Sequence, residues 1–271
     1  MLLEEPRIER VRHALKARIA EVVEANPLTP LMRRIVLRSP SFADLVSLGF
    51  DDHVRLFMPD PDTGDILLPE ITPDGPVFPV ESRVPESREY TLRLVDAASN
   101  TVTIDFVLHG DGPAATWAAA ARPGDRVGVA GPRGSMVVKG AFDWHLFVGD
   151  ETALPAIGRR IEELPAGTRV IARIEINDVN ERQKIDTEAF LDLAWVERNG
   201  AVPGSPDLLT QALEDTAVPS GLGYAFVAAE ATVVKRIRQY LVEWRGLNPT
   251  WIKAPAYWRR NTAGYDDGHE H

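Results

Sequence analysis

The sequence contains no cysteine in its 271 residues. This absence excludes disulfides, thiolate catalysis, cysteine-held iron–sulfur clusters and cysteine-based zinc sites. Redox chemistry in such a protein has to come from a bound organic cofactor. Histidine is scarce as well, because the 6 histidines are scattered and form no HExxH-type pair. We therefore expect no built-in metal site.

Long apolar runs and an excess of positive charge are also missing. No segment approaches the roughly 20 apolar residues of a membrane span, and the charged N-terminus lacks the apolar core of a secretory signal. We therefore expect a cytoplasmic protein without membrane insertion. The 30 Lys+Arg against 40 Asp+Glu give a net charge of -10, which argues against nucleic-acid binding. A small basic pocket for an acidic ligand and a monomeric state are both compatible with this composition.

The sequence divides into two halves that differ in the secondary structure they predict. The first half carries short β-type runs separated by Gly- and Pro-rich turns, a pattern typical of an antiparallel barrel or sandwich. The near-helical spacing of apolar residues over 7–19 predicts a helix at the N-terminus, within residues 1–19. A second helix is expected over 113–121. The expected strands cover residues 20–25, 33–38, 53–58, 89–95, 101–108 and 126–130.

In the second half strands and helices alternate, which predicts a parallel sheet with helices on its faces. The expected strands cover residues 145–148, 169–176, 224–228 and 250–254, and the expected helices cover 153–163, 187–193, 206–214 and 232–244. The predicted organisation is an N-terminal antiparallel β-barrel domain over 1–140 and a C-terminal parallel-sheet α/β nucleotide-binding domain over 141–260. A disordered polar tail is expected over 261–271.

Two motifs in the first half suit a flat anionic cofactor. On a strand over 87–93, Arg88 and Tyr90 share one face and Thr91 and Arg93 the other. A guanidinium pairs with phosphate, a phenol ring stacks on a flat ring system, and a hydroxyl can bond its edge. The segment 109–117 then runs from a Gly-rich turn into a helix that begins near Pro113, where free N–H groups attract anions. A solvated strand and a tight turn without a ligand are the alternatives.

Further candidate segments lie along the rest of the chain. The turn 149–153 joins the first strand of the α/β domain to its first helix, the usual position for a dinucleotide, although the GxGxxG fingerprint is absent. A second strand end at 226–231 can line the same crevice. The Gly-rich segment 124–135 offers Arg133, and the C-terminal aromatics and cations suit an aromatic anion. Plain turns and an aromatic plug are the alternatives.

Taken in their order, these motifs resemble the siderophore-interacting protein family, the flavin-dependent ferric-siderophore reductases. The similarity covers roughly residues 19–260 and is carried by SREYTLR, DFVLHGDGPAATWA, ARPGDRVGVAGPRGS, VGDETALPAIGRR and the terminal YWRR. It implies a flavin-binding barrel and a nicotinamide-binding α/β domain, as in ferredoxin reductases. Three positions depart from the family pattern: Ala115 stands where Ser is frequent, Ala229 replaces a usual Gly, and Pro255 lies in a segment that is commonly Ala-Ser-Gly-Tyr-Trp.

The resemblance also implies site residues. The FAD contacts would be Arg88, Tyr90, Thr91, Arg93, His109, Asp111, Ala114, Ala115, Thr116 and Trp117. The nicotinamide-nucleotide contacts would be Gly149, Asp150, Glu151, Thr152, Ala153, Glu230 and Ala231. The contacts to an anionic ferric siderophore would be Arg55, Arg133, Lys253 and Arg259.

The activity implied is NAD(P)H-dependent reduction of a ferric siderophore, with hydride transfer to the flavin and electron transfer to Fe(III) and no side chain as acid or base. The sequence leaves NADPH and NADH both open, with Arg173 and Arg198 as possible partners of a 2′-phosphate. One alternative is a ferredoxin-reductase-type flavin enzyme with another acceptor. The other is a ferric-siderophore-binding protein without enzymatic activity.

Overall fold

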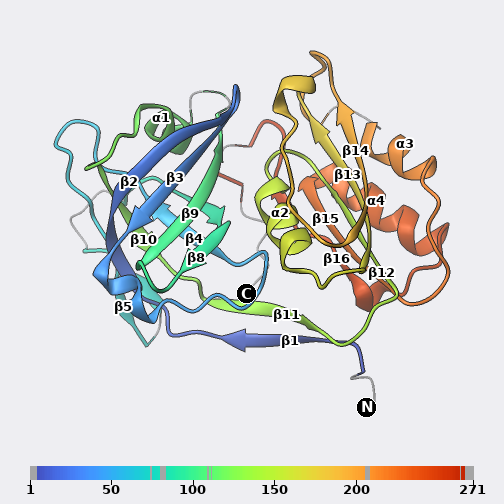
Figure 1. Ribbon diagram of the computed structural model, residues 1–271. Helices are drawn as coiled ribbons and strands as arrows, with labels where there is room; N and C mark the ends of the chain where they lie inside the picture. Colours follow the sequence, from blue (N-terminus) through green and yellow to red (C-terminus); the bar gives the residue numbers. More distant parts are fainter. Residues whose placement is uncertain are drawn as a thin grey trace. The chain divides into compact units, whose positions relative to one another are not determined.

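The computed structural model describes residues 5–73, 75–79, 84–108, 110, 112–204, 208–262 and 264–265, which form two compact units (Figure 1). The first unit is Ile8–Val138. The second consists of the described residues of Lys139–Glu270 and of Met1–Arg7. Among the described residues, no helix combines the length and the apolar character that crossing a membrane requires.

The first unit is built on a seven-stranded antiparallel sheet in the order β7-β4-β10-β2-β3-β9-β8. Tyr90 on β7 and Phe106 on β9 have ring centroids 4.4 Å apart, so the two ends of the sheet approach each other and enclose a common core. This is the expected antiparallel barrel. Its strands are β2 (Ala17–Thr29), β3 (Met32–Arg38), β4 (His53–Phe57), β7 (Ser87–Thr91), β8 (Leu94–Asp96), β9 (Thr101–Val107) and β10 (Arg126–Ala130).

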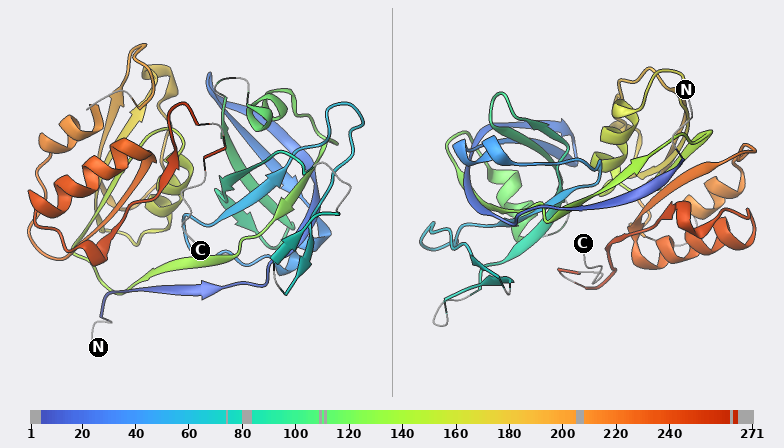
Figure 2. Two further views of the ribbon diagram at one scale, coloured as in Figure 1. Left: turned by 180° about the vertical axis from the view of Figure 1, so that it is seen from behind. Right: turned by 90° about the horizontal axis from the view of Figure 1, so that it is seen from below.

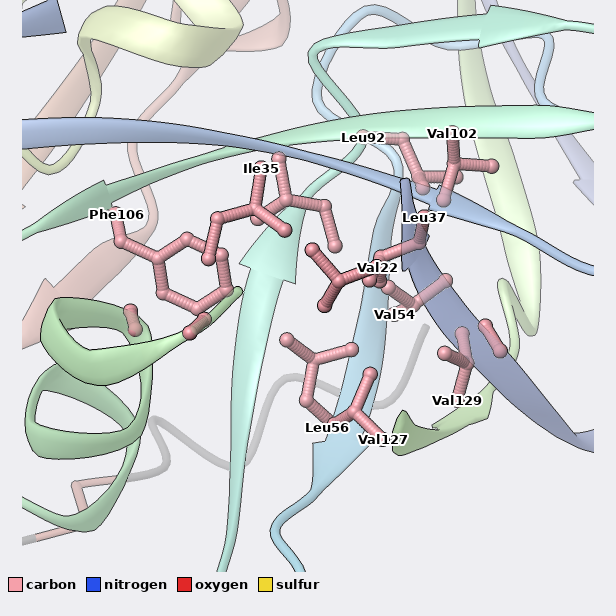
Figure 3. Close-up of a cluster of buried hydrophobic side chains, with 14 of the residues drawn as sticks. Val22, Ile35, Leu37, Val54, Leu56, Leu92, Val102, Phe106, Val127 and Val129 are labelled. Carbon is pink, nitrogen blue, oxygen red and sulfur yellow. The ribbon is translucent and has the colours of Figure 1, made fainter. Parts of the chain in front are cut away.

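The barrel core is made mainly of aliphatic side chains and includes the aromatic rings of Phe42 and Phe106. The labelled side chains point toward one another (Figure 3). Strand β4 shows the alternation that builds it: Val54 and Leu56 are fully buried, while His53 and Arg55 lie on the outer face. Helix α1 (Pro113–Ala120) packs Ala114 and Ala118 against the same core. The labelled core residues are Val22, Ile35, Leu37, Val54, Leu56, Leu92, Val102, Phe106, Val127 and Val129.

Residues 7–12 form a strand, so the helix predicted over 7–19 is wrong. Strand β1 (Arg7–Arg12) pairs with β11 (Gly134–Lys139) in a separate two-stranded sheet, and β2 begins at Ala17. The helical spacing rested on four apolar residues among charged ones, and pairing with β11 satisfies the backbone instead. The remaining elements of this half are η1 (Pro40–Asp44) and a hairpin of β5 (Glu70–Thr72) and β6 (Gly75–Val77).

The second unit contains the expected parallel sheet, in the order β14-β13-β12-β15-β16 with β17 also on β15. Every residue of β12 and β15 is buried, as expected for strands covered on both faces. Figures 1 and 2 show α2 on one face and α3 with α4 on the other. The strands are β12 (Trp144–Gly149), β13 (Arg169–Ile176), β14 (Phe190–Glu197), β15 (Gly223–Glu230), β16 (Ile252–Lys253) and β17 (Ala256–Trp258). The helices are α2 (Leu154–Glu163), α3 (Leu208–Glu214), α4 (Ala231–Glu243), η2 (Val179–Glu181) and η3 (Pro249–Trp251).

One helix predicted in this half is a strand. The segment 187–193 carries apolar residues at helical spacing, but Phe190–Glu197 pairs with all eight residues of β13 in parallel register. Phe190 is 73% exposed, so this edge strand lacks the clean burial pattern that would have identified it. The predicted tail 261–271 lies partly outside the described residues, and Thr262 forms a bridge with Arg259.

Candidate functional site

The first candidate motif lies on β7, which pairs with β4 in antiparallel register. Arg88 stands opposite Leu56 and Tyr90 opposite Val54, so both share the face of the core residues. Thr91 lies on the other face, opposite His53. Arg93 lies beyond the end of the strand, and its Nε is 3.8 Å from Asp105 Oδ2. The structure therefore places Arg88, Tyr90 and Thr91 on one short strand and Arg93 outside it.

Tyr90 belongs to an aromatic group that connects this strand to α1. Its ring is 4.4 Å from that of Phe106, and Phe106 is 5.9 Å from Trp117 of α1. Burial raises the pKa of Tyr90 to about 12, although the charge of Arg88 opposes this shift. The phenol is therefore neutral at physiological pH and keeps its proton for hydrogen bonding.

Two polar groups of the motif complete this part of the barrel. The Arg88 guanidinium donates to the Ser87 carbonyl at 2.8 Å and lies 3.7 Å from Glu86. Thr91 is only 8% exposed. An arginine, a neutral phenol and a hydroxyl thus lie within four residues of one strand, as a ring system joined to a phosphate requires.

The start of α1 forms the second candidate motif. The helix follows Gly112 with Pro113 at its first turn, and no side chain caps this end among the described residues. Its first-turn N–H groups therefore suit an anion. Ala114 and Ala115 are buried while Thr116 is exposed, so only the main chain of the two alanines can face a ligand. His109 and Asp111 lie outside the described residues.

The parallel sheet brings the two predicted nucleotide segments together. From β12 the chain moves outward to β13 and β14 and returns to β15 on the other side of β12, so the strand order reverses between β12 and β15. Ligands of open α/β sheets bind outside the carboxyl ends of the strands at such a point. Gly149 ends β12 beside Ala228 of β15. Residues 150–153 follow Gly149, and residues 230–231 lie at the junction of β15 and α4.

Gly149 allows β12, β15 and α2 to approach closely at this edge. A Cβ atom on Gly149 would lie 2.7 Å from the Ala153 Cβ and from the Ala228 carbonyl oxygen, and 2.9 Å from Ile157 Cδ1. A side chain cannot be accommodated without moving main chain.

Asp150 links this turn to the C-terminal strand. Its Oδ1 accepts from the Thr152 N–H at 2.9 Å and from the Thr152 hydroxyl at 2.5 Å, and its Oδ2 accepts from the Trp258 indole N–H at 2.8 Å. Burial raises the pKa of Asp150 despite these hydrogen bonds. The carboxyl group therefore orders the turn from a buried position.

Glu151 takes part in a buried ion-pair network. Its two oxygens accept from Arg198 at 2.6 and 2.7 Å, and Arg198 also lies 3.3 Å from Glu175 on β13. Burial, together with the charges of Asp150 and Glu151, raises the pKa of Glu175 to about 7, although Arg198 opposes the shift. Arg198 is thus committed to carboxylates and is not placed for a 2′-phosphate.

Arg173 is engaged in the same way. It bonds Asp192 Oδ2 at 3.0 Å and the Thr216 hydroxyl at 2.8 Å, and it is only 8% exposed. Neither arginine considered for the 2′-phosphate therefore faces a ligand.

Glu230 caps α4. Its Oε2 accepts from the N–H groups of Thr232 and Val233 at 2.7 and 3.2 Å, and its Oε1 accepts from the Arg260 N–H at 3.3 Å. The N-terminus of α4 is therefore satisfied by the protein's own carboxylate, and Glu230 acts as a structural group at the edge.

The residues implied for the siderophore fall in both units. In the first unit, Arg55 on β4 is opposite Ala130, the last residue of β10. Arg133 is exposed on the turn that follows β10. In the second unit, Lys253 pairs with Phe226 within the sheet, and Arg259 is exposed after β17.

Two contacts at these sites were not identified from the sequence. Glu89 contacts Arg55, and Trp258 donates to Asp150. The contact between Glu89 and Arg55 can be recognised only when the register of β4 and β7 is known. The contact between Trp258 and Asp150 depends on the position at which β17 pairs with β15.

Comparisons with known proteins agree on one family. Residues 21–136 match the siderophore-interacting FAD-binding domain, and residues 142–261 match the siderophore-interacting protein model. The NADPH-dependent ferric-chelate reductase of Escherichia coli is 34% identical over 92% of this chain and 96% of that protein. The ferric vibriobactin reductase of Vibrio cholerae is 31% identical over 90% of this chain and 89% of that protein.

A solved structure gives the same result. The crystal structure of a siderophore utilization protein from T. fusca matches with a TM-score of 0.89 and 41% identity, covering 97% of this chain and 99% of that chain. The chain belongs to the siderophore-interacting protein family, with the family's FAD-binding domain in residues 21–136.

Proposed function

We propose that this chain is a cytoplasmic flavin enzyme that uses NADPH or NADH to reduce ferric siderophores and thereby releases Fe(II). The observation that carries the proposal is the pairing of two parts in one chain. One is the family's FAD-binding domain, with Arg88, Tyr90 and Thr91 on one strand. The other is an α/β domain whose strand order reverses beside Gly149. The names of two relatives that match about nine-tenths of this chain or more point to the same reaction.

The barrel residues fit the parts of FAD. The neutral phenol of Tyr90 offers a ring for stacking, Thr91 a hydroxyl for the ring edge, and Arg88 a charge for the diphosphate. The uncapped first turn of α1 adds main-chain N–H groups for the same diphosphate. FAD, when bound, supplies hydride acceptance from the nicotinamide and transfer of single electrons to Fe(III).

The edge of the α/β domain would hold the nicotinamide nucleotide. Gly149 keeps the main chain close, and the turn through Thr152 offers a hydroxyl. No side chain has to transfer a proton in the redox steps, so the residues of this chain position the reactants and exclude water. Iron leaves after reduction because hard oxygen ligands hold Fe(II) less tightly than Fe(III).

Substitution of the flavin motif tests the proposed FAD site. Arg88→Ala and Tyr90→Ala should each purify with at least about tenfold less FAD, because a charge-assisted contact or a ring contact is lost. The measurement is the absorbance near 450 nm relative to 280 nm after incubation with FAD. Glu86→Ala, which removes the exposed neighbour of Arg88, should keep its flavin. Full FAD occupancy in both motif variants would show that the cofactor lies elsewhere.

An anaerobic assay tests the reaction itself. Flavin absorbance should bleach with NADPH or NADH and return when a ferric siderophore is added. Reoxidation by a carrier protein or a quinone, but by no ferric siderophore, would favour a ferredoxin-reductase-type enzyme. A protein that stays colourless with added FAD but binds the chelate would favour a carrier.

A further inference from the structure

Glu89 lies between two basic side chains on the outer face of the barrel. Its Oε1 accepts from Arg55 Nη2 at 2.6 Å and from Arg55 Nε at 3.2 Å, and its Oε2 is 3.7 Å from His53 Nε2. Arg55 and Glu89 are directly opposed in the β4–β7 register. The Glu89 carboxylate therefore already pairs with the basic side chains of Arg55 and His53, which an anionic ligand would otherwise contact.

This group shares its face of the sheet with Thr91. Glu89 and Thr91 are alternate residues of β7, and His53 stands opposite Thr91. Thr91 is the residue proposed to bond the edge of the flavin ring. Glu89 lies two residues before Thr91 on the same face of β7, and Arg55 lies opposite Glu89. A ferric chelate that takes electrons from the flavin would have to approach this part of the surface.

The pair is weak enough to exchange. The side chains of Arg55 and Glu89 are 38% and 40% exposed, and exposed ion pairs contribute little to stability. A carboxylate or catecholate oxygen of a ligand can replace Glu89 beside the guanidinium. Even when a ligand oxygen has replaced it beside Arg55, the Glu89 carboxylate stays nearby. Its charge repels the ligand more strongly as the negative charge of the ligand increases.

We propose that Glu89 sets the charge selectivity of the chelate site: it competes with ligand oxygens for Arg55 and disfavours highly anionic ferric siderophores relative to neutral ones. This inference rests on the proposed function, and it specifies how the net charge of a ferric siderophore affects its binding at that site. A purely structural cross-strand pair would contribute to the stability of the sheet, but it would not change the order in which chelates of different charge bind.

Binding of redox-inert chelates tests the inference without electron transfer. The probes are the gallium(III) complexes of a hexadentate tricatecholate, which is trianionic, and of a hexadentate trihydroxamate, which is neutral. Calorimetric titration of the FAD-loaded protein at low ionic strength gives both dissociation constants. Glu89→Gln should bind the trianionic complex about five-fold more tightly and the neutral complex with less than about a two-fold change. The gain should shrink as salt is added.

Two further variants separate competition for Arg55 from a general charge effect. Glu24→Gln removes the same charge from an exposed position on β2 and should leave both affinities unchanged. In an Arg55→Gln background, the gain from Glu89→Gln should fall to about two-fold or less, because the contested guanidinium is absent. An unchanged ratio of the two affinities in Glu89→Gln, or a full gain in the Arg55→Gln background, overturns the inference.

The proposed function fails on a different result. If the wild-type protein neither binds the gallium complexes nor reduces their iron(III) counterparts, the chain is not a ferric-siderophore reductase. If it reduces the iron(III) complexes but Glu89→Gln leaves the charge preference unchanged, only the role of Glu89 is wrong.

Discussion

At the scale of single residues, Glu175 is a buried carboxyl group whose pKa is raised by burial and by neighbouring carboxylates and lowered by Arg198. It is 3% exposed, lies near Asp150 and Glu151, and has Arg198 as its cationic partner. Glu151 and Glu175 thus share one guanidinium at the carboxyl edge of the sheet, with the charge of Asp150 nearby. Because the pKa of Glu175 is about 7 in the folded protein and about 4.5 without the fold, folding of this domain is linked to proton uptake.

This linkage predicts a pH dependence of stability with a definite sign. The folded pKa lies above the unfolded one, so the contribution is fully present below pH 4.5 and is lost as the pH rises through about 7. The slope is at most about 1.4 kcal/mol per pH unit. Glu175→Gln should remove this slope and should therefore gain stability relative to the wild type between pH 5 and pH 8.

Urea unfolding at several pH values between 5 and 8 measures this effect. Glu243→Gln, an exposed carboxylate of α4 in the same unit, should keep the wild-type slope. Equal slopes in the wild type and Glu175→Gln would contradict the assignment of the pKa.

The residue scale also shows where sequence reasoning ends. Arg88, Tyr90 and Thr91 could be singled out because a strand places alternate residues on known faces. The commitment of Arg198 to Glu151 and Glu175 could not, because it depends on which strands lie side by side and in what register. Buried partners distant in sequence leave no local pattern.

At the scale of elements, the junction of β12 and α2 leaves no room for a side chain on Gly149. Gly149→Ala should destabilise this unit by about 1–3 kcal/mol, because the new Cβ meets main chain at 2.7 Å. Binding of the nicotinamide nucleotide should weaken as well, since the turn through Thr152 starts here. Urea unfolding and fluorescence titration with NADPH measure the two effects.

FAD content is the internal control for this variant, because the flavin motif belongs to the other unit. Loss of FAD from Gly149→Ala, or nucleotide binding equal to that of the wild type, would contradict the assigned role of the glycine.

Elements with strong periodicity were predictable and edge elements were not. Strand β13 has the expected bounds 169–176, and it lies between β14 and β12, where seven of its eight residues are buried and its apolar residues are mostly β-branched. Strand β14 lies at the edge of the sheet, where exposure of Phe190 blurs the alternation. Strand β1 is short and charged, so the few apolar residues over 7–19 indicated a helical period that is not formed, and its conformation comes from pairing with β11.

At the scale of the whole molecule, each unit has its own hydrophobic core. The barrel core includes Val22, Leu56 and Phe106, whereas the α/β core includes Trp144 and Ile237. We therefore expect two unfolding transitions in calorimetry. Added FAD should raise the transition of the barrel unit by mass action, and Gly149→Ala should lower only that of the α/β unit. A single transition that moves as one in both experiments would contradict this expectation.

The overall architecture followed from the change of texture along the sequence, from short punctuated strands to alternating strands and helices. The buried and exposed faces of the sheets could also be predicted from the sequence. The contacts between segments that are distant in the sequence could not. The composition constrains the chemistry further: with no cysteine in 271 residues, the protein offers no thiolate to recapture the Fe(II) that it would release.

The hydrogen bond from Trp258 to Asp150 has a practical consequence. The emission of an indole depends on the electric field around its ring, and this indole donates directly to a buried carboxyl group. A change in the charge of Asp150, or the arrival of phosphate groups beside it, alters that field. Trp258 is therefore an intrinsic fluorescent reporter at the nucleotide edge, and Trp258→Phe gives the background against which its signal can be separated from that of the other tryptophans.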